Sequence, residues 1–97
     1  MEYKNDNLGV RLEVVDNPTV RRQLAYKSAL FGAKADEFYE GLWMAARNYI
    51  DTLECEYLTL DTDISTVTDK RITDALIWIG LTVWGHYSRL DTTPKNS

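Results

Sequence analysis

The most apolar stretch of the chain is Leu76–Trp84, and its spacing constrains the fold more than any other feature. Apolar side chains recur there at three- and four-residue steps, the spacing of one helix face: Ile72, Ala75, Leu76, Ile79, Val83 and Tyr87. A second apolar line lies beside the first and consists of Ile77, Trp78, Leu81 and Trp84. Such a helix is central or shared with a partner, because each of these side chains left in water forfeits about 1.5–3 kcal/mol. We therefore expect a helix over residues 68–90 with more apolar surface than one small core needs.

A β-strand is the alternative for this stretch, because it is short and rich in residues that suit a sheet. Its flanks favour a helix, since Asp69 supplies negative charge before the first turn and His86 lies near the carboxyl end. Gly80 and Gly85 each cost about 1 kcal/mol relative to Ala within a helix, so they predict a close backbone approach or a bend. A membrane span is not expected, because about 20 apolar residues are needed and this stretch is shorter.

Three further elements precede this helix. Val10, Leu12 and Val14 alternate with polar residues, which predicts a strand within residues 8–15, paired either with residues 57–60 or with another molecule. Asn17-Pro18 predicts the start of a helix that ends at Gly32, with one stripe made of Val20, Leu24, Ser28 and Phe31 and with Tyr26 and Leu30 beside it. A longer helix is expected over residues 35–53, with Trp43 near the edge of its apolar stripe, and the short connection predicts an antiparallel helical hairpin.

The expected fold is mainly α, with three helices and a short N-terminal β-strand, or a two-stranded β element if residues 57–60 pair with that strand. A chain of 97 residues makes one domain with a modest core. We place this single helical domain at residues 8–90, between a flexible arm at residues 1–7 and a flexible tail at residues 91–97.

The net charge and the number of cysteines argue against two classes of protein, namely nucleic-acid-binding proteins and proteins stabilised by internal disulfides. The formal net charge of −4 argues against direct nucleic-acid binding, which needs clustered Lys and Arg. Acidic residues are concentrated in the middle of the chain, where Arg47 is the single basic residue of residues 36–63. One cysteine, Cys55, excludes an internal disulfide framework, and a cytoplasmic location is expected.

The patterns that carry chemistry in other proteins are incomplete here. Asp61, Asp63, Ser65 and Asp69 fit four positions of a calcium loop, but Thr66 and Ile72 stand where that loop needs Gly and Glu. The only histidine, His86, has no partner at a spacing typical of zinc sites or nucleophilic pairs. The sequence therefore predicts no enzyme, no metal and no other cofactor.

With no catalytic or metal site expected, two kinds of protein-binding function fit the sequence. In the first, the chain binds a protein partner or a second copy of itself through Trp78, Leu81 and Trp84, with Trp43 as a secondary anchor. In the second, an acidic surface formed by Asp36, Glu37, Glu40, Asp51 and Glu54 mimics phosphates and blocks a nucleic-acid-binding protein.

Three segments also carry a resemblance. They are Asn17-Pro-Thr-Val-Arg-Arg-Gln-Leu24, Phe38-Tyr-Glu-Gly-Leu-Trp-Met-Ala-Ala-Arg47 and Ser88-Arg-Leu-Asp-Thr-Thr-Pro-Lys-Asn96. Together they resemble small proteins encoded in the tail-gene region of long-tailed bacteriophages, among which the tail assembly chaperones are the nearest match. The resemblance implies a largely helical protein that coats the tape-measure protein in the cytoplasm of the infected host. The phosphate mimic would then be a phage-encoded inhibitor of a host protein.

Overall fold

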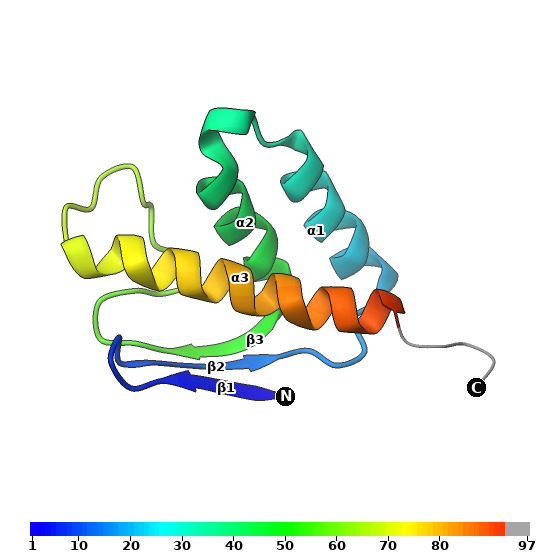
Figure 1. The fold of residues 1–97 in the computed structure, drawn as a ribbon, viewed down its shortest axis with the longest axis horizontal. Helices are drawn as coiled ribbons and strands as arrows, with labels where there is room; N and C mark the ends of the chain where they lie inside the picture. Colours follow the sequence, from blue (N-terminus) through cyan, green and yellow to red (C-terminus); the bar gives the residue numbers. More distant parts are fainter. Residues whose placement is uncertain (93–97) are drawn as a thin grey trace.

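The computed structural model describes the backbone of residues 1–92 and the side chains of residues 1–88. Three helices and a three-stranded antiparallel sheet make up the fold, which is therefore mixed α/β (Figure 1). In chain order the elements are β1 (Glu2–Asn5), β2 (Val10–Val14), α1 (Val20–Gly32), the 3₁₀ turn η1 (Ala35–Glu37), α2 (Phe38–Ala46), the 3₁₀ turn η2 (Arg47–Tyr49), β3 (Ile50–Glu54) and α3 (Lys70–Thr92). The helices α1 and α2 form the expected hairpin, and α3 runs along the sheet and crosses α2 (Figure 1).

The strand expected within residues 8–15 is confirmed as β2, but the partners expected for it were wrong. Its neighbours are β1 and β3, which pair Tyr3 and Leu53 with Leu12 from opposite sides. Residues 57–60 form no strand, although Leu58 is buried in the core. The three expected helices are present, but the expected one or two strands are corrected to a three-stranded sheet.

Residues 2–5 form strand β1, whereas the sequence pattern suggested a flexible arm over residues 1–7. Gly9 makes the return to β2 possible, because its φ of 66° is a conformation that other residues rarely adopt. The Tyr3 hydroxyl forms a hydrogen bond of 2.9 Å with Nδ1 of the buried His86, which ties β1 to α3. A strand of four mostly polar residues has little sequence signal of its own, because pairing with β2 decides its conformation.

The helix expected over residues 35–53 is about half as long in the structure. It ends at Ala46, and the chain passes through η2 into β3. The Asn48 side-chain amide donates to the carbonyl oxygens of Met44 and Ala45, which occupies acceptors that a continuing helix would use. Ile50 and Leu53 fit a helical spacing in the sequence, but in the structure they belong to a strand that pairs with β2. The helical interpretation was therefore wrong for residues 50–53, while residues 47–49 form a 3₁₀ turn.

Helix α1 is confirmed, but the residue that caps its start and the face that it buries both differ from the prediction. Thr19, rather than Asn17, caps it, since its hydroxyl oxygen accepts from the Arg22 amide at 3.2 Å. Tyr26 faces the core and stacks on Tyr49 with the ring centroids 4.4 Å apart. The stripe of Val20, Leu24 and Phe31 points to solvent instead.

Helix α3 is also confirmed, from Lys70 to Thr92. Asp69 precedes it and accepts a hydrogen bond of 2.9 Å from the Arg71 amide, as expected for a residue before the first turn. Residues 91 and 92 of the expected tail belong to α3, and residues 93–97 lie outside the described part of the chain. Within the described residues, no helix combines the length and apolar character needed to cross a membrane.

Candidate protein-binding surface

One side of α3 is buried in the core of the protein. Ile72, Ala75, Ile79 and Val83 face inward and pack with the inner side chains of β2. Gly80 lies against α2, where a Cβ atom would be 2.8 Å from the Leu42 Cβ atom. The close approach expected from the glycines is thus found at Gly80, whereas a Cβ atom at Gly85 would have nothing within 4 Å.

The second apolar line of α3 is only partly covered. Leu81 is 48% exposed and Trp84 is 42% exposed, while Ile77 is half-buried. These three residues are four and three positions apart, so they lie along one line on the helix, which we call the α3 stripe. The described chain therefore leaves apolar side chains of α3 in contact with solvent, as the sequence predicted.

The other two tryptophans occupy different environments. Trp78 is partly buried and packs against the core, so it flanks the α3 stripe rather than forming its centre. Trp43 is fully buried, which corrects its expected place at the edge of a helix stripe. It turns inward because α2 is covered by α3 on one side, while Gly41 brings the helix close to Ala33. Trp43 is thus a core residue and is not accessible as an anchor.

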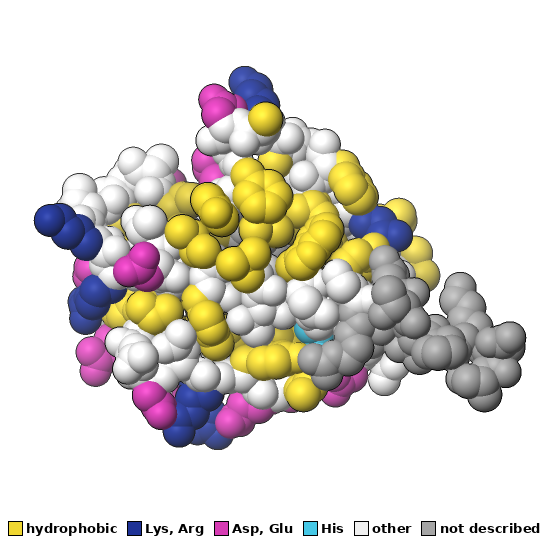
Figure 2. Space-filling model, in the orientation of Figure 1, with side chains coloured by type: hydrophobic (Ala, Val, Ile, Leu, Met, Phe, Trp, Pro, Cys, Tyr) yellow, Lys and Arg dark blue, Asp and Glu magenta, His cyan; other side chains and the backbone are white. Residues whose placement is uncertain are grey.

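Further aromatic groups lie near the carboxyl end of α3 and at the start of α2. The Trp84 ring lies 6.5 Å from the Tyr87 ring, and the Lys27 ammonium lies 5.7 Å from the centroid of Tyr87. Phe38 and Tyr39 are exposed at the start of α2 with their ring centroids 5.3 Å apart. Figure 2 shows hydrophobic side chains gathered in a band over the region where α3 crosses the hairpin. Contiguous apolar surface of this kind is typical of interaction sites.

The sequence pattern did not identify all of this surface. Val20, Leu24, Phe31, Phe38 and Tyr39 are exposed, although they fit the apolar stripes of two amphipathic helices. A second apolar line on α1 could have indicated which face of this helix is buried. It consists of Tyr26, Ala29 and Leu30, and these residues face the core in the structure.

The acidic residues proposed as a phosphate mimic do not form one surface. Asp36, Glu37 and Glu40 lie at the tip of the hairpin, whereas Asp51 and Glu54 belong to β3 in the sheet (Figure 1). The Arg22 guanidinium also lies 3.3 Å from an Asp51 carboxylate oxygen. A hollow of about 300 Å³ is lined by Glu40, Asp61 and Asp63, and Arg47 lines it as well.

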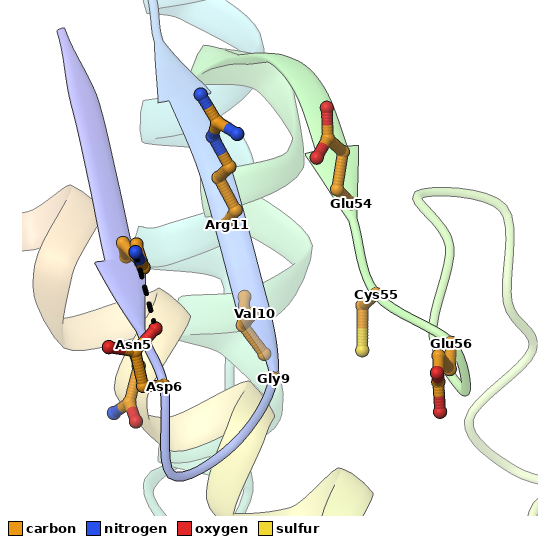
Figure 3. Close-up of a pocket in the computed structure, with 9 residues that line it drawn as sticks. Asn5, Asp6, Gly9, Val10, Arg11, Glu54, Cys55 and Glu56 are labelled. Carbon is orange, nitrogen blue, oxygen red and sulfur yellow. Dashed lines mark ion pairs between the residues drawn. The ribbon is translucent and has the colours of Figure 1, made fainter.

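A larger hollow of about 410 Å³ lies where the chain after β3 separates from β2. Figure 3 shows the Cys55 side chain pointing into it, with Glu54 and Glu56 on one side and Asp6 on the other. Its basic residues have acidic neighbours, since Lys4 lies 3.5 Å from Asp6 and Arg11 lies 2.9 Å from Glu2. Both basic side chains at its rim are therefore paired with carboxylates, and Glu54 and Glu56 add two further acidic groups.

Nearby, the Tyr57 hydroxyl donates to the Leu8 carbonyl oxygen, and the Arg71 guanidinium lies 4.3 Å from the Tyr57 ring centroid. Burial raises the pKa of the Tyr57 phenol. These contacts fix the loop before α3 onto the turn between β1 and β2, which gives Tyr57 a structural role.

No group of three or more His, Cys, Asp or Glu side chains suited to hold a metal ion occurs in the described part of the chain. Comparisons with protein-family models, with curated proteins and with solved structures found no match.

Proposed function

We propose that this protein is a non-enzymatic binding and assembly factor whose α3 stripe docks an apolar helix of another protein. The observation that carries the proposal is the exposure of Leu81 and Trp84 on a helix whose opposite side already fills the core. Covering the exposed part of these two side chains, which is roughly half of each, would contribute about 1 kcal/mol each, since full burial contributes about 1.5–3 kcal/mol.

The form of the surface favours a helix as the partner. The α3 stripe is linear, so an amphipathic helix can lay its apolar face along α3. A phage tail assembly chaperone requires such a surface to hold a long helical tape-measure protein in the host cytoplasm. The sequence resemblance supports this role, and it would make the partner a phage tail protein.

A binding measurement tests the proposal directly. The probe is a synthetic amphipathic peptide with Leu at helical spacing and Gln elsewhere, and the readout is tryptophan emission during titration. Binding should shift the emission of Trp84 to shorter wavelength. Leu81→Ser should weaken binding about tenfold or more, because truncating an anchor costs about 2 kcal/mol. The matched control is Val67→Ser, which changes an exposed apolar side chain in the loop before α3 and should leave binding unchanged.

Equal binding by the Leu81→Ser and Val67→Ser variants would contradict a role for the α3 stripe. Absence of any binding to the peptide would argue against capture of apolar helices as a class. Circular dichroism of each variant keeps a folding defect separate from a binding defect.

The second candidate is the acidic inhibitor, and the grouping of Glu40 with Asp61 and Asp63 favours it. A phosphate mimic would act through this group and through Asp36 and Glu37 at the tip of the hairpin, without the α3 stripe. Reversal of Asp36, Glu37 and Glu40 to Lys should then abolish inhibition of a nucleic-acid-binding target, whereas Trp84→Ala should preserve it. The opposite result would favour the α3 stripe.

A further inference from the structure

The outer face of α1 is the most exposed apolar feature among the described side chains. Phe31 is 75% exposed, Val20 is 68% exposed and Leu24 is 62% exposed, and no other large hydrophobic side chain in this part of the chain exceeds them. Their spacing of four and seven residues places them on one line, which we call the α1 line. The line spans about 16 Å, since a helix rises about 1.5 Å per residue.

The protein cannot bury the α1 line by rotating α1. Tyr26 occupies the inward face, where it stacks on Tyr49 and contacts the Tyr87 ring at a centroid distance of 4.8 Å. Gly41 of α2 fits against Ala33 at the end of α1, which fixes the distance between the two helices. A rotation would replace both aromatic contacts of Tyr26 and this close approach with solvent. The α1 line is therefore exposed because the core fixes α1, and none of the described side chains can cover it.

Charges at the two ends of the hairpin are of opposite sign. Arg21 lies in the first turn of α1, whereas Asp36 and Glu37 lie in η1 at the tip, where Lys34 offsets one of their two charges. Arg21, Asp36 and Glu37 are exposed and take part in no ion pair with the residues that the structure describes. An antiparallel neighbour of the same kind would bring the tip of one hairpin beside the base of the other.

We propose that the α1 line is a self-association surface, covered by α1 of a second copy in an antiparallel, two-fold symmetric arrangement. A two-fold axis near the middle of α1 places Val20 opposite Phe31 of the second copy, and Leu24 opposite the aliphatic part of Lys27. The same axis brings the first turn of each α1, which carries Arg21, toward the acidic tip of the other hairpin twice, as an isologous interface requires. This interface does not involve the α3 stripe, so it adds a second contact to the proposed function and does not depend on it.

Sedimentation equilibrium of the full chain over a wide concentration range tests the interface. The wild type should dimerise, and Leu24→Ser and Phe31→Ser should each raise the dimer dissociation constant about tenfold or more. Trp84→Ser and Val67→Ser are the matched controls, because they remove exposed apolar side chains elsewhere and should leave the dissociation constant unchanged. All four positions are exposed, so circular dichroism should show folded variants.

A charge exchange tests the antiparallel arrangement. Arg21→Glu and Glu37→Arg should each weaken the dimer about two- to fivefold, which corresponds to the strength of exposed ion pairs. The double variant should recover the wild-type dissociation constant, because the same two charges meet again with their signs exchanged.

Three results would overturn this proposal. One is a wild type that stays monomeric at every concentration, and another is a dimer that tolerates both Leu24→Ser and Phe31→Ser. The third is a dimer that Trp84→Ser disrupts, since this would assign self-association to the α3 stripe. A double charge variant that stays weak would overturn the antiparallel arrangement. Peptide binding through Leu81 is measured separately, so failure of either proposal is distinguishable from failure of the other.

Discussion

Gly80 of α3 lies so close to Leu42 of α2 that a Cβ atom on residue 80 would be 2.8 Å from the Leu42 Cβ atom. The main-chain carbon of Leu42 would be 3.4 Å away, so the α2 backbone as well as its side chain limits the space. This contact sets how deeply α3 sits against the hairpin. It therefore also decides which side of α3 remains outside.

Gly80→Ala should lower the free energy of unfolding by about 1 kcal/mol. Overpacking costs about 1–3 kcal/mol, and the better helix propensity of Ala returns about 1 kcal/mol. Gly85→Ala is the matched control, because the added methyl group meets nothing and should stabilise the protein by about 0.5–1 kcal/mol. Urea denaturation of both variants measures the difference. Stabilisation by both substitutions would show that α2 and α3 do not touch at Gly80.

Trp43 and Trp84 should differ sharply in their contribution to stability. Trp43→Ala should cost about 3–5 kcal/mol, because it empties a fully buried site in the core. Trp84→Ala should cost about 1–2 kcal/mol, since only a little more than half of its side chain is buried. Thermal unfolding followed by circular dichroism checks both values. Similar losses for the two variants would place Trp84 in the core as well and remove the α3 stripe.

Tyr3→Phe should destabilise the protein by about 1 kcal/mol. The substitution removes the hydroxyl that hydrogen-bonds to Nδ1 of the buried His86, and a typical hydrogen bond contributes about this amount. Tyr39→Phe removes a hydroxyl from a ring that is exposed at the start of α2, so it should have no measurable effect. Denaturant midpoints of the two variants provide the comparison. An unchanged midpoint for Tyr3→Phe would mean that β1 is not held through this contact.

Asp69 should titrate below its ordinary pKa of 3.8, because the Arg71 side chain and amide hydrogen-bond to its carboxylate. A carboxyl group whose pKa is lower in the folded state stabilises the fold above its unfolded pKa. That contribution is lost as the pH falls through the folded pKa. Asp69→Asn should therefore flatten the dependence of stability on pH below about pH 4. Carbon-detected NMR of the carboxyl group measures the pKa itself, and a value at or above 3.8 would contradict this pairing.

The sequence determined the helices that have a long, consistent period and a clear end. The spacing of Ile72, Ile79 and Val83 predicted α3 with its buried side, and the α1–α2 hairpin followed from the short connection after Gly32. The alternation of Val10, Leu12 and Val14 likewise predicted β2, because a period of two distinguishes the faces of a strand. The apolar residues in excess on α3 were also visible in the sequence.

Only the tertiary structure decided which strands pair and which apolar faces remain outside. Leu53 fits a helix or a strand by spacing alone, and pairing with Leu12 made it part of β3. Val20, Leu24 and Phe31 look like a core stripe until Tyr26 takes the inward position between Tyr49 and Tyr87. Periodicity states that a helix has an apolar face. Which of two competing faces is buried depends on contacts between residues far apart in the chain, and these exist only once the chain has folded.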